Sequence, residues 1–280
     1  MLDATLPPPA LQRARGAARV TLKSRDGTAV LDGLRQDGCA KAILPRTDSP
    51  VPEVVFLNTA GGLTGGDRLH YGLTVADGLC AVATTQTAER AYEAGAGCAE
   101  VDVALKVGIG GWLDWLPQET ILFDGAALDR RVTLDLGAGA GCLFLETLVL
   151  GRHAMGETVR GLTLRDVRMV MRDGVPLWFE PMALDSRALS RAGNPAILGG
   201  ARAMATLALV HPGAGDLLAP LRATLDEEGV EAAASAFDGR LILRVLAWDG
   251  LPLRRLILRA LSVLRPHLPS CGPLPRVWQT

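Results

Sequence analysis

Carboxylates beside or inside apolar segments are the residues of this sequence most able to do chemistry. Glu146 follows Leu143-Phe144-Leu145, and Glu180 follows Leu177-Trp178-Phe179. A carboxylate in a protein core costs several kcal/mol unless it is paired. Each such acid therefore either pairs with an arginine or faces a polar cavity. The acids in these positions are Glu89, Glu119, Asp124, Glu146, Glu157 and Glu180.

Two glycine pairs, Gly61-Gly62 and Gly65-Gly66, lie in residues 58–67. Because glycine adopts positive φ without strain, these pairs predict a tightly folded loop with exposed backbone amides. The spacing matches neither the dinucleotide-binding pattern nor the P-loop, and no lysine follows it. The sequence therefore favours a structural turn that positions Asp67 rather than a phosphate-binding loop.

The sequence lacks the motifs of tight metal binding and of covalent catalysis. Its histidines form no i, i+4 pair, and its five cysteines show no C-x-x-C spacing. No serine lies in a G-x-S-x-G elbow. We therefore expect reduced thiols, no imidazole or thiolate metal site and no activated nucleophile.

Length and charge narrow the class of protein. The 280 residues suit one large domain, and 29 basic residues nearly cancel 30 acidic ones to leave a formal net charge of −1. Such a balance disfavours nucleic-acid binding. The sequence has neither an apolar run of ~18 residues nor the pattern of a secretion signal. We expect a cytoplasmic protein that binds neither membrane nor nucleic acid.

Short apolar segments between glycines and prolines predict a mainly β fold. Ala99–Val107 places apolar side chains at every odd position, which is the period of a half-buried strand. Within residues 162–171 the apolar positions change from even to odd, which predicts a β-bulge near Arg165-Asp166. Further strands are expected at 53–57, 131–136, 142–150, 203–210 and 240–248. We detect no internal sequence repeat.

Two helices are expected near the end of the chain. Leucines at positions 217, 218, 221 and 225 recur at helical spacing, with Asp216 placed to cap the first turn and Gly229 to end the helix. A second apolar stripe runs from Leu253 to Leu264 and stops at Pro266.

Four blocks of the sequence are distinctive: NTAGGLTGGDRL at 58–69, TTQTAERAY at 84–92, WLPQETILF at 115–123 and LGRHAMGE at 150–157. They occur in the same order and at similar separations in the UreD (UreH) family of urease accessory proteins. The chain therefore resembles that family over about residues 50–160, and more loosely beyond.

The resemblance implies a β-helix-like stack of mixed sheets with a small C-terminal part of two helices. It implies a single domain over residues 1–280, in which 1–15 form a flexible tail and 211–280 contain the helices. It also implies a maturation factor that is not an enzyme. UreD proteins bind urease apoprotein, recruit UreF and through it the GTPase UreG, with UreE acting indirectly, to assemble the dinuclear nickel centre of urease.

The family further implies an internal water-filled tunnel that nickel follows. Oxygen ligands suit a relay, because clustered thiolates or imidazoles would hold nickel too long. Our hypothesis is that one polar channel is faced by Asp67, Glu89, Glu119, Glu146 and Glu180. The signature loop is formed by Gly61, Gly62, Gly65 and Gly66, and the loop or tunnel is supported by Thr84, Gln86, Arg152 and Glu157. We expect no tightly bound cofactor, only transient Ni²⁺.

The sequence leaves three alternatives open. The acids could instead pair with Arg68, Arg90, Arg152 and Arg172 to stiffen the stack. The protein could be a scaffold for UreF and UreG while nickel travels elsewhere. It could also be an enzyme whose glycine loop binds a small anion and whose general base is Glu89 or Glu119. For the accessory protein, we expect residues 216–280 to contribute to the UreF interface and the isolated chain to aggregate.

Overall fold

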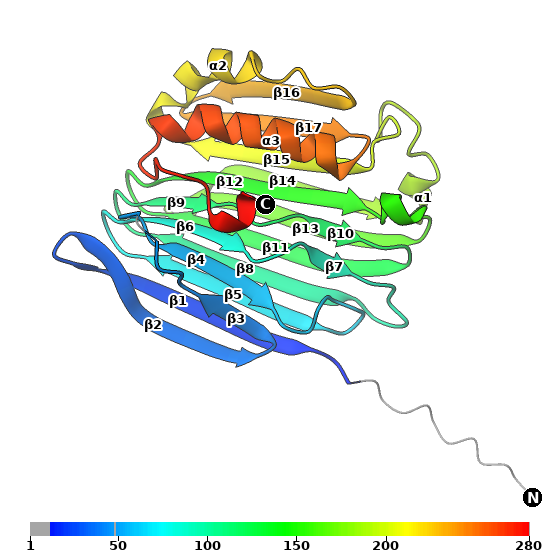
Figure 1. The fold of residues 1–280 in the computed structure, drawn as a ribbon, viewed down its shortest axis with the longest axis horizontal. Coiled ribbons are helices and arrows are strands. Elements are labelled where there is room, and N and C mark those ends of the chain that lie inside the picture. Colours follow the sequence, from blue (N-terminus) through cyan, green and yellow to red (C-terminus); the bar gives the residue numbers. More distant parts are fainter. Residues whose placement is uncertain (1–11, 48, 280) are drawn as a thin grey trace, which may run out of the picture.

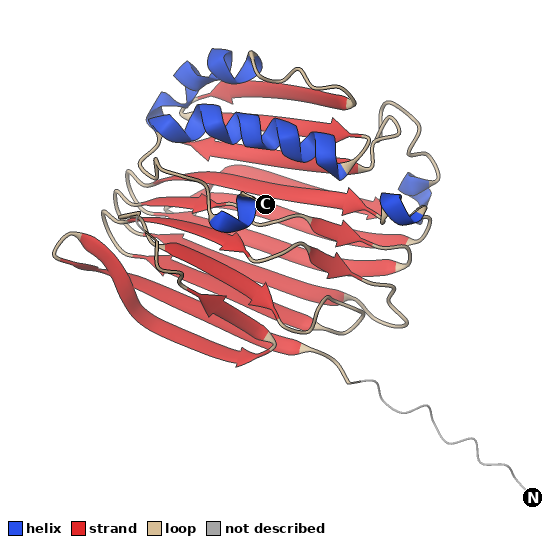
Figure 2. Cartoon of the chain, viewed as in Figure 1, coloured by secondary structure: helices blue, strands red, loops and turns tan. Residues whose placement is uncertain are grey.

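Two β-sheets lie face to face in the computed structural model, which describes residues 12–47 and 49–279, and helices cover the outer side of one sheet (Figures 1 and 2). The seven-stranded sheet has the order β14 (Val175–Asp185), β13 (Leu162–Arg172), β11 (Ala126–Leu136), β8 (Ala99–Val107), β5 (Arg68–Val75), β1 (Arg15–Arg25) and β2 (Thr28–Gly38). The expected mainly β class of stacked mixed sheets is confirmed.

The ten-stranded sheet faces the first across an apolar layer. Its order is β16 (Val230–Phe237), β17 (Arg240–Ala247), β15 (Ala203–Val210), β12 (Gly141–Leu150), β9 (Trp112–Trp115), β6 (Cys80–Thr85), β4 (Glu53–Asn58) and β3 (Ala40–Ile43). Two short strands complete it: β10 (Thr120–Leu122) pairs with β12, and β7 (Glu89–Ala91) pairs with β10.

The middle of the chain winds as a solenoid, because successive strands alternate between the two sheets and neighbours within each sheet run parallel. Thus β5 pairs with β8 and β8 with β11, while β4 pairs with β6 and β6 with β9. Equivalent positions lie about one turn apart: His70 Nδ1 is 2.9 Å from Asp102 Oδ2, and the two residues are 32 positions apart. Thr84 Oγ1 donates to Leu116 O at 2.6 Å over the same separation. The fold is therefore repetitive although the sequence is not.

Apolar residues form two layers, one on each face of the ten-stranded sheet. Phe144 of β12 packs between the sheets, while its neighbours Leu143 and Leu145 pack toward the helices. Both faces of this strand are buried, which explains why the segment is apolar almost throughout.

Helix α3 (Gly250–Leu264) covers the outer face of the ten-stranded sheet, and the expected stripe is its buried side. Asp249 caps it by accepting from Gly250 N at 2.6 Å. The buried residues are Leu253, Leu256, Ile257, Ala260, Leu261 and Leu264. The remaining helices are short: α1 (Ser186–Leu189), α2 (Leu218–Arg222) and 3-10 turns at His153–Met155, Pro212–Leu217, Arg265–His267 and Arg276–Trp278.

The helix expected over 216–229 is therefore shorter than its leucine spacing indicates. His211, not Asp216, caps the preceding turn by accepting from Gly213 N at 3.0 Å. The chain leaves the helix after Arg222 because the next segment is bound to α3: Arg259 Nη2 donates to Asp226 O at 2.8 Å and also contacts Glu227.

The β-bulge expected near Arg165-Asp166 is wrong. Strand β13 pairs with β11 in continuous register from Leu162 to Arg172, and its even positions remain inward through Val170. Asp166 and Arg168 occupy two of these inward positions as a buried ion pair, so the sequence has polar residues where an apolar inward pattern would continue. The only register shift of β13 lies with β14, between Val170 and Met171.

Two of the predicted strands, 99–107 and 203–210, have those bounds in the structure. Strands β1, β2 and β3 were not predicted from the sequence. Most of the expected tail at 1–15 lies outside the described residues, and Arg15 already begins β1. None of the described helices is both long enough and apolar enough to cross a bilayer.

Candidate functional site: a charge chain between the sheets

Six charged side chains run in a line through the otherwise apolar layer between the sheets. We call them the charge chain: Glu146 of β12, Arg130 of β11, Asp166 and Arg168 of β13, Glu180 of β14 and Arg244 of β17. Strand register builds it, because Arg130 lies beside Asp166 in one sheet, and Glu146, Thr206 and Arg244 form a row across the other. Positive and negative groups alternate along the chain.

The inner half of the charge chain is buried and fully bonded. Arg130 Nη1 lies 2.8 Å from Glu146 Oε2, and Arg130 grips Asp166 with Nε at 3.0 Å and Nη2 at 2.6 Å. Trp115 Nε1 donates to Glu146 Oε1 at 2.8 Å, and Arg130 Nη1 donates to Thr120 Oγ1 at 3.0 Å. Such pairing is what makes charges tolerable in a core.

The outer half leads to the surface through Glu180. Arg168 bonds Asp166 at 2.6 Å and lies 3.4 Å from Glu180 Oε1, which also accepts from Thr206 Oγ1 at 2.7 Å. Arg244 Nη2 closes the line at 2.6 Å from Glu180 Oε2. The Arg244 side chain is 63% exposed, compared with 1% for Arg168 and 7% for Arg130.

Electrostatics keeps the middle of the charge chain ionised. Burial alone would raise the pKa of Asp166, but the guanidiniums of Arg130 and Arg168 outweigh burial and lower the pKa to about 2. Burial opposes the charge of Arg130 as well, yet Asp166 and Glu146 raise the pKa of this guanidinium above its ordinary value. The inner acid and base are therefore both charged at any physiological pH.

Small cavities meet the inner end of the charge chain. Arg130, Glu146 and Gln118 line an inner cavity of about 50 Å³. This cavity shares Tyr71, Thr85 and Glu89 with an outer one of about 60 Å³, which opens beside the glycine loop. Within the described chain, Gln118 Nε2 is buried without a hydrogen-bond partner. The inner cavity thus has mostly apolar walls with a few polar groups among them.

Glu89 separates these two cavities. Burial raises the pKa of its carboxyl to about 7, although hydrogen bonds from Arg90 N at 3.1 Å and from Asn58 Nδ2 at 3.3 Å favour the charged form. The group is therefore close to half ionised at neutral pH. Glu89 and Glu146 both line the inner cavity, and ion pairs connect Glu146 to Glu180 and the exposed Arg244.

Comparison with known proteins identifies the family of this chain. The family model described as UreD urease accessory protein matches residues 14–279. The chain belongs to the UreD family. It is 62% identical to the urease accessory protein UreD of Cereibacter sphaeroides over 279 residues, which covers 99% of this chain and 100% of the relative. It is 57% identical to that of Paracoccus denitrificans, with 100% and 96% covered. The corresponding protein of Jannaschia is 48% identical, with 100% of both chains covered.

Three of the five carboxylates that the sequence singled out in this UreD chain are not members of the charge chain, and of these three only Glu89 shares a cavity with it. Asp67 is buried, and its carboxylate accepts from Ala14 N at 2.7 Å and Thr64 N at 2.8 Å. It ties the glycine loop to the start of β1. The structure therefore brings together Glu89, Glu146 and Glu180, with Asp67 behind the loop.

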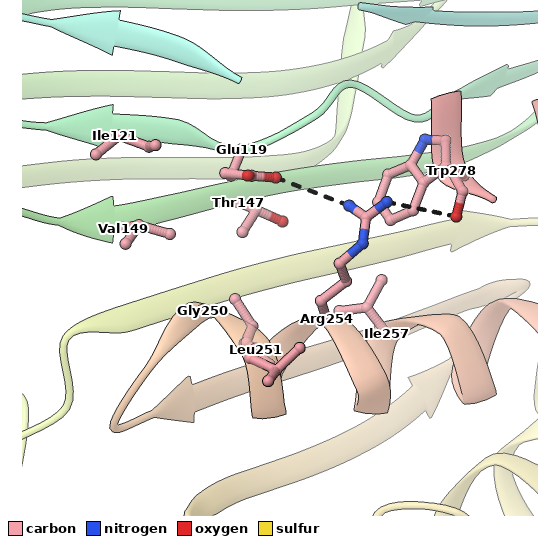
Figure 3. Close-up of a pocket in the computed structure, with 10 residues that line it drawn as sticks. Glu119, Ile121, Thr147, Val149, Gly250, Leu251, Arg254, Ile257 and Trp278 are labelled. Atoms are coloured by element: carbon pink, nitrogen blue, oxygen red, sulfur yellow. Dashed lines mark hydrogen bonds and ion pairs between the residues drawn. The ribbon is translucent and has the colours of Figure 1, made fainter. Parts of the chain in front are cut away.

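Glu119 faces the opposite side of the ten-stranded sheet in this UreD fold. It lines a groove of about 250 Å³ between α3 and strands β10 and β12, 3.9 Å from Arg254 Nη1 (Figure 3). The Arg254 guanidinium also lies over the Trp278 ring, 4.9 Å from its centroid.

The UreD signature loop is a closely packed turn. Gly61, Gly62 and Gly66 have the positive φ that the sequence allows at all four glycines of this loop, whereas Gly65 does not. A Cβ on Gly62 would lie 2.3 Å from Tyr92 Cε2, and one on Gly65 would lie 2.2 Å from Ala96 O. The glycines are thus required by packing at these two points.

The four sequence blocks converge at one corner of successive solenoid turns. Tyr92 Oη donates to Gly61 O at 3.1 Å, the Tyr92 and Phe123 rings meet edge to face at 4.9 Å, and Arg152 lies 4.3 Å over Phe123. Arg152 Nε pairs with Glu157 at 2.9 Å. Thr84 is buried one turn away, and Gln86 lines the outer cavity. Of these supporting residues, Gln86 lines the outer cavity together with Glu89, and the others pack the corner behind it.

Sequence reasoning missed the cations of this UreD site. It proposed Arg68, Arg90, Arg152 and Arg172 as ion partners, but Arg68 pairs with Glu100 and Arg172 donates to Ala140 O. The partners of Glu146 and Glu180 are Arg130, Arg168 and Arg244. One signal was available: Asp166 and Arg168 lie on the even positions that Leu162 and Leu164 mark as inward. In the described part of the chain, no group of three or more His, Cys, Asp or Glu side chains could hold a metal ion.

Proposed function

We propose that this chain is a cytoplasmic, non-enzymatic factor of urease maturation that binds urease apoprotein and, with UreF and the GTPase UreG, passes nickel to it, with UreE acting indirectly. Membership of the UreD family supports the maturation role. The observation that carries the relay is the line of polar groups from Glu89 through Glu146 to Glu180, with cavities at its inner end.

The ligand chemistry of this line suits transfer. Single carboxylates separated by several side chains bind Ni²⁺ more weakly than thiolate or imidazole clusters do. A conducting path needs sites that admit the ion and then release it. Glu89 adds a group that is partly ionised at neutral pH, at the point where the two cavities meet.

Passage through the middle requires movement of Arg130 and Arg168, because their guanidiniums occupy the carboxylates there. Breaking a buried ion pair without replacement costs about 3–5 kcal/mol. A divalent cation supplies replacement charge to the same oxygens, so the exchange costs less than simple breakage. We infer that nickel moves by displacing each arginine in turn.

Glu146→Gln tests the relay at its most buried acid. The amide keeps the size of the side chain and removes the charge that nickel needs. Urease matured with this variant is expected to contain several-fold less nickel than urease matured with the unaltered protein, measured as metal per active site after a fixed time.

Asp114→Asn is the matched control, because Asp114 is equally buried and is paired with Arg265 at 3.0 Å on the α3 side of the same sheet. Copurification with UreF establishes that both variants assemble. If the two variants lost nickel loading equally, the charge chain would have a structural role and no specific role in nickel transfer.

The groove beneath α3 supports a UreF interface in residues 216–280. Its walls are mostly apolar, and beside it Trp248 and Leu251 are 69% and 59% exposed. Exposed apolar groups of this size mark protein contacts and also explain the expected aggregation of the isolated chain. Leu251→Lys should abolish copurification with UreF, whereas Val175→Lys, at a residue 62% exposed on β14, should not.

A scaffold without nickel passage is the second candidate function. The observation that favours it is the complete pairing of Glu146, Asp166 and Glu180 by arginines, which alone would stiffen the two sheets. This candidate predicts normal nickel loading whenever the complex assembles, including with Glu146→Gln.

A further inference from the structure

Arg244 differs from the other arginines of the charge chain in its freedom to move. The ten-stranded sheet extends beyond the edge strand β14 with β17 and β16, and the overhang forms a trough of about 630 Å³. Arg244 and Glu180 lie in this trough with Met182, Met204 and Ala233. The guanidinium of Arg244 is mostly exposed, so solvent and open space lie beside it.

We propose that Arg244 is a tethered counter-cation for Glu180, which occupies the carboxylate between metal ions and swings into the trough when a divalent cation takes its place. This inference rests on the proposed relay. It assigns Arg244 as the residue that determines which ions enter at this end and how briefly they stay.

The energies of the ion pairs favour exchange at Arg244 over the other arginines. Arg244 is 63% exposed although its partner Glu180 is only 11% exposed, whereas both partners of each inner pair are buried, so releasing Arg244 into solvent is less costly than breaking an inner pair. Glu180 would keep its bond from Thr206 at Oε1 while Oε2 becomes free for the cation. Exchange therefore begins at the trough, before any inner pair is displaced.

Charge gives this arrangement its selectivity. At equal distance a divalent ion attracts a carboxylate twice as strongly as a monovalent ion does. The guanidinium carries one positive charge and is tethered beside Glu180, so it outcompetes free potassium or sodium, whereas a divalent ion has twice its charge with which to displace it. After the metal moves on, the tethered arginine returns and keeps Glu180 from retaining a second ion.

Nickel titration of the purified complex of the full chain with UreF tests the proposal, with Ni²⁺ alone as the probe and binding measured by equilibrium dialysis. Arg244→Gln should tighten binding by about two- to five-fold, which is the effect of removing a competing exposed pair. The double variant Glu180→Gln with Arg244→Gln should lose this gain.

Arg165→Gln is the matched control, because Arg165 is 64% exposed and lies 3.9 Å from Asp129 on the outer face of the other sheet. It removes the same charge and should bind nickel as the unaltered protein does. The proposal is overturned if Arg244→Gln binds nickel like Arg165→Gln or more weakly, or if its gain survives the loss of Glu180.

The nickel content of urease distinguishes a failure of the relay from a failure of the role proposed for Arg244. If Glu180→Gln alone lowers the nickel content of urease but Arg244→Gln fails to tighten binding, the relay stands and the role of Arg244 is refuted. If Glu180→Gln leaves the nickel content unchanged, the relay through this end fails, whatever the titration shows.

Discussion

Two buried aspartates, Asp166 and Asp114, lie on opposite sides of the ten-stranded sheet, and their pKa values are shifted in opposite directions. Asp166 lies between the sheets and binds two arginines, and their charges outweigh burial to lower its pKa to about 2. Asp114 lies on the α3 side and binds only Arg265, so burial prevails and raises its pKa despite hydrogen bonds from Trp112 and Ser270. One guanidinium does not offset full burial here, and two do.

The surroundings of the two aspartates differ as well. The Asp114 pair is short: it ends at Arg265, which also donates to Gly272 O at 3.0 Å and Ser270 O at 2.9 Å and lines a pocket of about 350 Å³. Asp166 belongs to a line that reaches a cavity at one end and the trough at the other. Burial, pairing and an adjoining cavity are common to both, so the continuation of the Asp166 line to open space at both of its ends is the feature that indicates a relay.

The largest expected effect on stability is that of Asp166→Asn. Two buried guanidiniums would lose their shared carboxylate, and such a loss costs about 3–5 kcal/mol of unfolding free energy. Asp114→Asn should cost less, about 1–3 kcal/mol, because Arg265 keeps two carbonyl acceptors. Urea unfolding of both variants measures the difference, and a larger loss in Asp114→Asn would break the comparison.

The contributions of the two aspartates to folding stability should change in opposite directions as the pH falls. The lowered pKa of Asp166 stabilises the fold above the ordinary value of 3.8, and this contribution should disappear as the pH falls toward about 2. The raised pKa of Asp114 means that the folded state binds the proton more tightly, so its contribution should improve as the pH falls through the raised pKa. Stability differences between the parent and each Asn variant, measured against pH, should slope in opposite directions.

Glu89 extends the test to a group that lines both cavities. Its pKa is raised from 4.5 to about 7, so the folded state gains stability relative to Glu89→Gln as the pH falls from about 7 to 4.5. Thermal unfolding of the two proteins at several pH values measures this gain. A constant difference across the range would show that Glu89 titrates normally.

The smallest effects are expected at exposed pairs. Arg244→Gln and Arg165→Gln should each change the unfolding free energy by less than about 1 kcal/mol, because both side chains are largely in solvent. If Arg244→Gln lowered the unfolding free energy by several kcal/mol, Arg244 would be required for stability in the same way as the buried Arg168.

The sequence predicted elements with regular apolar periods and failed where polar residues hold core positions. The stripe of α3 and the alternation of β8 determine their buried faces directly. Strand β13 was misjudged because Asp166 and Arg168 point inward, and only neighbouring strands show that the two charges compensate each other. The period of about 32 residues escaped notice because its spacing varies from turn to turn and equivalent corner positions are only loosely alike: Tyr92 and Phe123 are aromatic, whereas the next turn holds Arg152.

The candidate site shows the same limit. Glu146 and Glu180 stood out because they interrupt apolar runs, whereas Glu119, chosen for the same reason, lies beneath α3. Neighbouring residues of a strand face opposite sides of a sheet, so the side on which an acid lies depends on register that the sequence alone leaves undetermined.

Nickel bound per urease active site tests the central claim most directly, after maturation with a Glu146→Gln, Glu180→Gln double variant and, in parallel, with Asp114→Asn. If nickel passes between the sheets, the double variant should leave urease largely without metal while Asp114→Asn supports normal loading. Full loading with the double variant in an assembled complex would contradict the account.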